Sequence, residues 1–211
     1  MTTLLLLSSS LALAADYEIS AEVGRLDVAK GGYELFGSEY GITTMGVRLQ
    51  YIKNQNLSFN ASYHRWVDGG RVQFGDYYYE DTEISGGPGV DEGFHTGFWG
   101  NLVGLGVRGG VDLWGWLSPY GTVELRGMRV TARFDDDPSQ DDNPNQITLH
   151  GASVGFAAAA GLSLRIPSTR GFTVSHYTEF GYEAMTPLSL GTAGDIAFRG
   201  LHIRSGLGVR F

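Results

Sequence analysis

Residues 44–51 read Thr-Met-Gly-Val-Arg-Leu-Gln-Tyr, and residues 57–64 read Leu-Ser-Phe-Asn-Ala-Ser-Tyr-His. In both stretches an apolar or aromatic side chain occupies every second position. Side chains two residues apart share one face of a β-strand, so each stretch predicts a strand with an apolar face and a polar face. The short segment Lys53–Asn56 between them predicts a turn that joins the two strands antiparallel.

The same alternation recurs in further segments that begin near Tyr17, Val103, Val123, Ala152, Phe172 and Leu201. In the segment near Val123 the apolar phase changes at Gly127, after which Met128 and Val130 carry it. One extra residue in a β-bulge reverses the faces in this way, so we expect a bulge there. The chain therefore predicts eight strands of roughly ten residues each.

The connections between these segments alternate in length. Those after the second, fourth and sixth segments are short: Ile52–Asn56, Asp112–Ser118 and Pro167–Gly171. Those after the odd segments are longer: Ala29–Gly41, Asp68–His95, Asp135–Gln146 and Thr186–Asp195. Short periplasmic turns and long extracellular loops are typical of bacterial outer-membrane barrels. The expected fold is all-β, a transmembrane up-and-down antiparallel β-barrel of eight strands.

The first 14 residues, Met1–Ala14, form a short apolar run that ends in Ala-Leu-Ala. This ending fits a signal-peptidase site, so we expect residues 1–14 to be a signal peptide and residues 15–211 to be the barrel domain. An ordinary buried helix is the alternative. No apolar run reaches the roughly 18 residues that a transmembrane helix needs.

Composition excludes several classes of function. The chain has 211 residues, a net charge of −8, 32 Gly and no Cys. The absence of Cys excludes disulfides and thiolate metal sites. With no basic cluster, a nucleic-acid partner is not expected. We predict no cofactor and no metal site, because the acidic connections lack the ligand spacing of a Ca²⁺ loop such as the EF-hand.

Charged residues in the predicted strands keep to the polar face. They are Glu18, Glu22, Arg48, Arg108, Glu124, Arg126, Glu179, Glu183, Arg204 and Arg210. A narrow eight-stranded barrel has room inside for side chains. We expect a mixed-sign network across the lumen, with Glu18 and Glu22 near Arg204 and Arg210, and with Arg108 beside Glu124 or Arg126. A structural plug is the favoured interpretation, and a gate or proton path is the alternative.

Aromatic residues lie near the predicted strand ends. Trp and Tyr prefer the membrane interface, where the ring is dry and the polar edge is wet. The predicted outer girdle consists of Trp66, Trp99, Trp114, Trp116, Tyr120 and Phe211.

The terminal segment Leu201–Phe211 resembles the last strand of Gram-negative outer-membrane proteins, which ends in Phe after alternating apolar residues. The chain as a whole resembles the small OmpA/OmpX-type barrels. The resemblance implies an outer-membrane location among lipid and lipopolysaccharide. It also implies recognition of the terminal strand by the barrel-assembly machinery, through Ile203, Leu207, Val209 and Phe211.

The expected function is a structural or surface-interaction role, with an extracellular ligand bound by acidic and aromatic loops such as those around Tyr77–Tyr79. A narrow channel for small or apolar solutes is the first alternative, and a lipid A-modifying enzyme is the second. The nearest match to a deacylase motif is His176-Tyr-Thr178, where Thr replaces the expected Ser. Without a nucleophile, a base and an orienting group in reach, no enzyme is predicted. The lipid-facing His176 has no explanation in the sequence.

Overall fold

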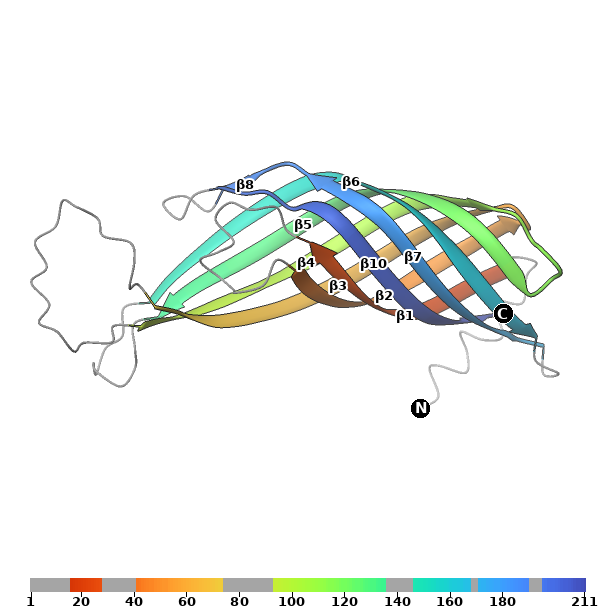
Figure 1. The fold of residues 1–211 in the computed structure, drawn as a ribbon, viewed down its shortest axis with the longest axis horizontal. Helices are drawn as coiled ribbons and strands as arrows, with labels where there is room; N and C mark the ends of the chain where they lie inside the picture. The colour runs from red at the N-terminus through yellow and green to blue at the C-terminus, as the bar shows by residue number, and fades with distance from the viewer. Residues whose placement is uncertain (1–15, 28–40, 74–92, 136–145, 168–170, 190–194) are drawn as a thin grey trace, which may run out of the picture.

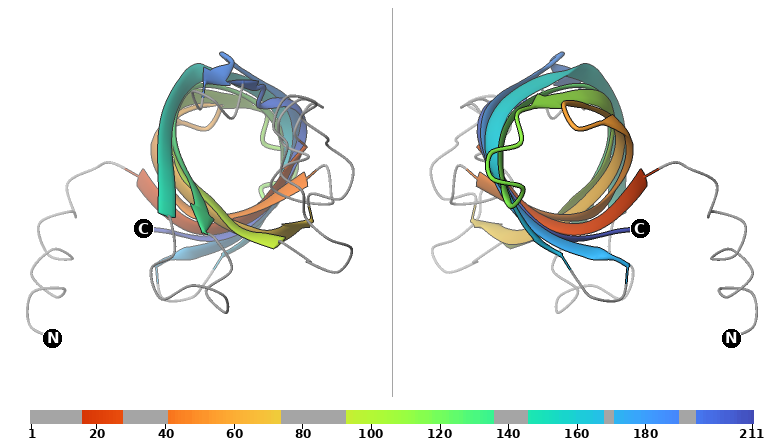
Figure 2. Two further views of the ribbon diagram at one scale, coloured as in Figure 1. Left: turned by 90° about the vertical axis from the view of Figure 1, so that its left-hand side faces the viewer. Right: turned by 90° about the vertical axis from the view of Figure 1, so that its right-hand side faces the viewer.

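The computed structural model describes residues 16–27, 41–73, 93–135, 146–167, 171–189 and 195–211. Eight long strands close into one antiparallel barrel, in the order β1-β10-β7-β6-β5-β4-β3-β2 (Figures 1 and 2). Their bounds are β1 Asp16–Asp27, β2 Gly41–Asn54, β3 Leu57–Gln73, β4 Gly93–Gly110, β5 Leu117–Asp135, β6 Gln146–Pro167, β7 Thr173–Met185 and β10 Arg199–Arg210. The eight-stranded barrel predicted from alternation is confirmed.

The first and last strands close the barrel. β1 pairs with β10 from Glu18 opposite Arg210 to Leu26 opposite His202. Two backbone hydrogen bonds join Tyr17 and Phe211, with N···O distances of 3.1 and 3.0 Å. The start of β1 and the end of β10 therefore lie at the same end of the barrel as the short turns.

The apolar face of the strands points outward. Val47, Val154 and Leu207 are 53%, 63% and 63% exposed, whereas Glu22, Arg48 and Arg204 are buried inside. A closed sheet satisfies every backbone hydrogen bond within itself, so it can carry such a belt through a bilayer. The architecture is that of a transmembrane β-barrel. Among the described residues, no helix is long and apolar enough to cross a bilayer.

The bulge predicted at Gly127 is wrong. β5 pairs without a break from Leu117 to Asp135 with β6, and without a register shift with β4. Met128, Val130 and Ala132 keep the inward phase of Glu124 and Arg126, and they are buried. The apolar phase changes because the lining of the barrel turns apolar toward the loop end.

This apolar lining forms a cluster at the loop end, which we term the apolar cap. Its buried members are Leu26, Ile42, Trp66, Phe98, Leu102, Met128, Val130, Ala132, Met185, Leu188, Ile196 and Phe198. The Phe198 ring lies 6.1 Å from that of Trp66 and 6.2 Å from that of Phe98, centroid to centroid. The cap therefore closes the half of the interior that lies toward the loops.

Part of the cap comes from a segment predicted to be a loop. Thr186–Asp195 contains β8 (Leu188–Ser189), which pairs with β9 (Asp195–Ile196) as a separate two-stranded sheet. Leu188 and Ile196 are fully buried. The apolar side chains of β8 and β9 pack among those of the cap, with Leu188 against Gly151 of β6.

The strands differ in length. β3, β4, β5 and β6 have 17 to 22 residues, whereas β1, β2, β7 and β10 have 12 to 14. β6 is nine residues longer than β7 (22 against 13). At about 3.3 Å per residue, that difference is about 30 Å along the strand. β3–β6 extend beyond their neighbours at the loop end, and we call this part the projecting sheet (Figure 1).

The projecting sheet shortens one of the expected connections, Asp68–His95, from both ends. Residues 68–73 and 93–95, predicted to be loop, continue β3 and β4. The predicted signal peptide and the acidic and tyrosine-rich parts of the long connections lie outside the described residues.

Replacing an outward residue near the middle of the belt with Arg tests the placement in lipid. Leu49 lies five residues from the end of β2, about 12 Å into a belt about 25 Å tall. Leu49→Arg is expected to reduce the stability of the barrel in lipid vesicles by about 2–4 kcal/mol. Val111→Arg, in an exposed turn, is the matched control and is expected to cost about 0–1 kcal/mol. Equal effects in a denaturant titration would contradict this placement.

Candidate functional site: the barrel interior

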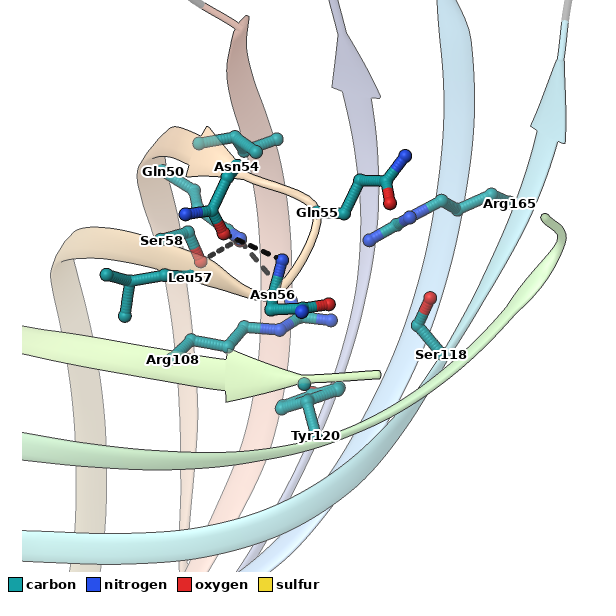
Figure 3. Close-up of a pocket in the computed structure, with 12 residues that line it drawn as sticks. Gln50, Asn54, Gln55, Asn56, Leu57, Ser58, Arg108, Ser118, Tyr120 and Arg165 are labelled. Atoms are coloured by element: carbon teal, nitrogen blue, oxygen red, sulfur yellow. Dashed lines mark hydrogen bonds between the residues drawn. The ribbon is translucent and has the colours of Figure 1, made fainter. Parts of the chain in front are cut away.

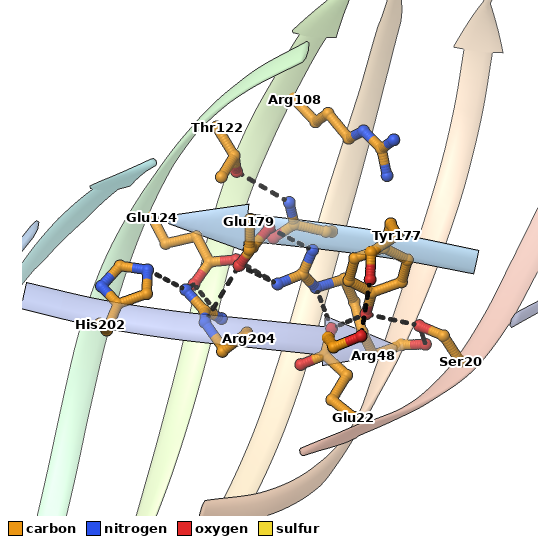
Figure 4. Close-up of polar contacts among 12 residues, drawn as sticks. Ser20, Glu22, Arg48, Arg108, Thr122, Glu124, Tyr177, Glu179, His202 and Arg204 are labelled. Carbon is orange, nitrogen blue, oxygen red and sulfur yellow. Dashed lines mark hydrogen bonds and ion pairs between the residues drawn. The ribbon is translucent and has the colours of Figure 1, made fainter. Parts of the chain in front are cut away.

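The interior of the barrel is organised around Arg48 of β2 (Figure 4). Its two terminal nitrogens donate to the carboxylate of Glu179 on β7 at 3.1 and 2.9 Å. Its Nε lies 2.7 Å from Oε1 of Glu22 on β1, and Nη2 lies 3.5 Å from Oε1 of Glu124 on β5. One guanidinium therefore joins three carboxylates from three other strands.

Two further arginines extend this cluster. Nε of Arg204 lies 3.0 Å from Oε1 of Glu179, and its Nη1 lies 3.4 Å from Oε2 of Glu124. Nη2 of Arg126 donates to the same oxygen of Glu124 at 2.7 Å, and its Nη1 pairs with Glu183. We call Glu22, Arg48, Glu124, Arg126, Glu179, Glu183 and Arg204 the charge cluster.

Tyrosine and histidine side chains surround the charge cluster. The Tyr177 hydroxyl donates to Glu22, and the Tyr120 hydroxyl donates to Oε2 of Glu179 at 3.2 Å. Nε2 of His64 lies 3.0 Å from Oε2 of Glu22, and Nε2 of His202 lies 3.1 Å from Nη2 of Arg204. Sequence reasoning did not place the two tyrosines in the interior, although both occupy the same alternate positions of their strands as the charged residues.

The remaining predicted charges lie elsewhere. Glu18 and Arg108 are buried on the inner face, but Arg108 does not pair with Glu124, which binds Arg126 instead. Arg108 lies over the Tyr120 ring, 3.4 Å from its centroid, and donates to Oε1 of Gln50 at 3.3 Å. Arg210 pairs with Asp16 at the rim. The sequence predicted Glu18 and Glu22 near Arg204 and Arg210: Glu18 lies opposite Arg210 in the β1–β10 ladder, and Arg204 acts electrostatically on Glu22, whose ion pair is with Arg48.

Glycines make room for the large polar groups. A Cβ on Gly206 would lie 2.5 Å from Cζ of Tyr177, and one on Gly106 would lie 2.6 Å from Cγ of Glu124. At these distances any side chain would displace the cluster. The inward glycines of β10 and β4 therefore permit the cluster to cross the lumen.

Little space remains in the described part of the interior. A cavity of about 10 Å³ lies between the charge cluster and the apolar cap, lined in part by His64, Glu183 and His202. This is about the volume that one water needs. A second cavity of about 20 Å³ lies at the turn end. Charge cluster and apolar cap are stacked along the barrel and fill it.

The structure corrects the predicted girdle at two positions. Trp66 and Tyr120 are 3% and 6% exposed, and they lie inside the barrel. Both occupy the inward phase of their strands, which overrides the preference of aromatic rings for the interface. Trp114, Trp116 and Phe211 are exposed at the turn end, where the two indoles stack with centroids 5.8 Å apart. Trp99 faces outward and is half-buried.

The outer face carries a polar group within the lipid belt. Nε2 of His176 lies 3.1 Å from Oγ of Ser205, which also donates to the backbone oxygen of Tyr177 at 3.2 Å. The Thr178 hydroxyl lies 3.4 Å from the same Oγ. Ser205 is therefore the partner that the sequence left unassigned for His176.

Further up the outer face, a polar row crosses three strands. Arg65 of β3 lies opposite Asn101 of β4, which lies opposite Arg129 of β5. The Tyr63 hydroxyl donates to Oδ1 of Asn101 at 2.7 Å. With Tyr63 and Trp99 beside it, this row marks the level where the apolar belt ends.

The residues predicted as the assembly signal all lie on the outer face. Ile203, Leu207 and Val209 of β10 and the following Phe211 are exposed. In the described part of the chain, no group of three His, Cys, Asp or Glu side chains is arranged to hold a metal ion.

The closed barrel, its outward apolar belt and its filled interior with buried charges define the class of outer-membrane β-barrels. No protein-family model matches the sequence, and no curated protein matches it. Three similar solved structures show the same fold. Ail, the attachment invasion locus protein of Yersinia pestis, is 16% identical with a TM-score of 0.51, over 94% of this chain and 100% of that chain.

Neisserial surface protein A is 15% identical with a TM-score of 0.50, over 93% of this chain and 97% of that chain. A major outer membrane protein from Thermus thermophilus is 12% identical with a TM-score of 0.51, over 94% and 100% of the two chains. At these identities the likeness establishes the fold.

Removing one carboxylate from the charge cluster tests its role in stability. Glu179→Gln leaves Arg48 and Arg204 short of a counter-charge, so the free energy of unfolding is expected to fall by about 3–5 kcal/mol. Arg210→Gln breaks the partly exposed pair with Asp16 and is expected to cost about 0–1 kcal/mol. Guanidinium titration in detergent micelles measures both. An effect of Glu179→Gln no larger than that of the control would contradict the prediction.

Proposed function

We propose that this chain anchors an interaction surface at the outer face of the outer membrane, and that its barrel does not conduct. The projecting sheet carries this proposal. A barrel that only spans the bilayer needs strands of about 9–11 residues. The 17 to 22 residues of β3–β6 exceed this length on one half of the barrel.

The backbone pairing of the projecting sheet supports a role in binding. The ladder between β2 and β3 ends at Met45 opposite Arg65, whereas the ladder between β3 and β4 continues to Gln73 opposite Gly93. A strand that extends past its neighbour presents backbone donors and acceptors along its edge. A protein partner in extended conformation can add to such an edge. The proposed partner is therefore a protein outside the cell.

Contact with the surrounding lipid is assigned to the outward row Arg65, Asn101 and Arg129. Both arginines are exposed on the outer face, at the level of Trp99 and Tyr63. Aromatic rings of this kind favour the membrane interface. Guanidinium groups bind phosphate oxygens in a two-pronged geometry. We assign this row to the phosphates of lipopolysaccharide. The terminal strand remains assigned to the barrel-assembly machinery, and residues 1–14 to a cleaved signal peptide.

The apolar cap and the charge cluster argue against a channel. Wild-type barrels in a planar bilayer are expected to give no sustained current, because ions would have to cross both the apolar cap and the charge cluster. Arg210→Gln, which lies outside both layers, is the control and is expected to be equally silent. A sustained current in the wild type that Arg204→Gln abolishes would support the channel instead.

The contact of His176 with Ser205 raises acyl transfer on a lipid as a second candidate function. The pair lies roughly 10 Å above Phe211, counting strand residues along a tilted barrel. Lipid esters lie near the interface, so the reacting carbonyl and this pair are at different depths. Triad chemistry requires a carboxylate that orients the histidine, and no carboxylate among the described residues contacts His176. We therefore propose a role in packing for this pair.

Shortening the segment between β3 and β4 tests the surface role. Deleting residues 69–97 removes the projecting ends of β3 and β4 together with their connection. Closing Asp68 to Phe98, which are paired in the ladder, with a short turn is expected to preserve heat-modifiable migration on gels. Adhesion of cells that display the protein to immobilised serum and matrix proteins is expected to fall. The matched control deletes residues 168–170 at the turn end. Unchanged adhesion after both deletions would contradict a surface role for the projecting sheet.

A further inference from the structure

Arg108 differs from the other three buried arginines of the barrel. Arg48, Arg126 and Arg204 each lie within 4.0 Å of at least one carboxylate in the charge cluster. Among the described residues, Arg108 makes no ion pair of that kind, and Glu18 and Glu179 act on it at longer range. Burial of a guanidinium without a close counter-charge is costly, so this exception requires a reason.

The surroundings of Arg108 provide one. Its guanidinium lies on the Tyr120 ring and makes one side-chain hydrogen bond, to Gln50. An arginine has five N–H donors in a planar fork. Arg108 is 5% exposed. Each of its nitrogens either has a hydrogen-bond partner or retains some contact with solvent. The remaining donors therefore open onto the cavity of about 20 Å³ at the turn end.

We call this cavity the turn-end vestibule (Figure 3). Arg108 and Arg165 both line it, together with the side chains of Gln55, Ser118 and other residues of the turns. Nη1 of Arg165 lies 3.3 Å from Oδ2 of Asp112, and the Ser118 hydroxyl donates to Oδ1 of the same carboxylate at 3.5 Å. Asp112 balances one of the two arginines. Arg108, the other arginine, has no carboxylate among the residues that line the vestibule, and Glu18 and Glu179 act on it from outside that lining.

The chemistry of the vestibule suits an anion. Arg165 at the rim and Arg108 at the floor supply guanidinium forks, and Gln55 and Asn56 lie between them in Figure 3. Such forks match the oxygens of a carboxylate or a phosphate. Stacking on Tyr120, whose hydroxyl is held by Glu179, fixes the orientation of Arg108. The volume, which has room for about two waters, limits the occupant to the oxygens of one small charged group, with the rest of the group outside the vestibule.

We infer that the turn-end vestibule is a binding site for a small oxyanion, a carboxylate or a phosphate group presented from the periplasm. Arg108 is the primary ligand and Arg165 the rim ligand. The site is separate from the projecting sheet and does not depend on the proposed function. It gives the periplasmic end of the barrel a means of holding an acidic group.

The test uses the chain refolded in an uncharged maltoside detergent, because phosphocholine detergents would compete. The Arg108 side-chain Nε–H signal is followed by NMR while inorganic phosphate, Ala-Ala or the C-terminal amide of Ala-Ala is added, with ionic strength held constant by NaCl. Saturable shifts are expected with phosphate or with Ala-Ala, and none with the amide. Saturation by phosphate alone identifies a free anion, and saturation by Ala-Ala identifies a peptide carboxylate.

Variants separate a site from general charge effects, with binding followed by the backbone signals of Gln55 and Ser118. Arg108→Gln is expected to abolish saturation, and Arg165→Gln to weaken binding about tenfold. Arg108→Lys keeps the charge but loses the guanidinium fork, so it is expected to weaken binding. It replaces Arg108→Gln as the test variant if Arg108→Gln does not fold. Arg210→Gln, at the same end but outside the vestibule, is expected to bind like the wild type. Shifts that do not saturate, or that persist in folded Arg108 variants, would overturn the inference.

Discussion

The structure depends on the pairing of buried charges inside a barrel too narrow to admit bulk water. In the described part of the chain, five buried glutamates and four buried arginines point inward from strands that are far apart in the sequence. Each would cost several kcal/mol if left alone at this depth, roughly the whole margin of a typical fold. Because Arg48 joins carboxylates from β1, β5 and β7, the cluster ties opposite walls of the barrel together. Paired charged side chains, and not an apolar core, fill the half of the interior nearer the turns.

The apolar cap shows that the usual alternation of a membrane barrel is not kept along its whole length. Above the charge cluster, inward positions carry Trp66, Phe98 and Met128, and the β8–β9 hairpin adds Leu188 and Ile196. A mouth closed by apolar side chains excludes ions from the cluster beneath it. At the opposite end, by the turns, the vestibule at Arg108 is a cavity of about 20 Å³.

The outer face and the strand count were predictable because lipid imposes the same rule at every level of the belt. Val47, Leu125 and Leu207 each follow the period of two without exception. The pairings inside the barrel were not predictable, since Glu22 and Arg48 meet through the closure and tilt of the sheet. Trp66 and Tyr120 were misplaced for a related reason: an aromatic ring at a strand end fits an interface or a lumen equally well. The change of apolar phase at Gly127 was interpreted as a bulge, whereas it marks the start of an apolar inner lining. A local pattern does not distinguish these two causes.

Within the apolar belt, the sequence by itself determined which face of each strand meets lipid, because a two-residue period and a ban on lipid-facing charge are local properties; beyond Gly127 of β5 it did not, because the inner lining there is apolar too. It likewise determined that the connections alternate between short and long. Tertiary structure alone decided which carboxylate meets which guanidinium, how far β3–β6 extend beyond their neighbours, and that Arg108 faces a vestibule in place of a partner. These depend on register and on the curvature of a closed sheet, which bring together side chains that are remote in the chain.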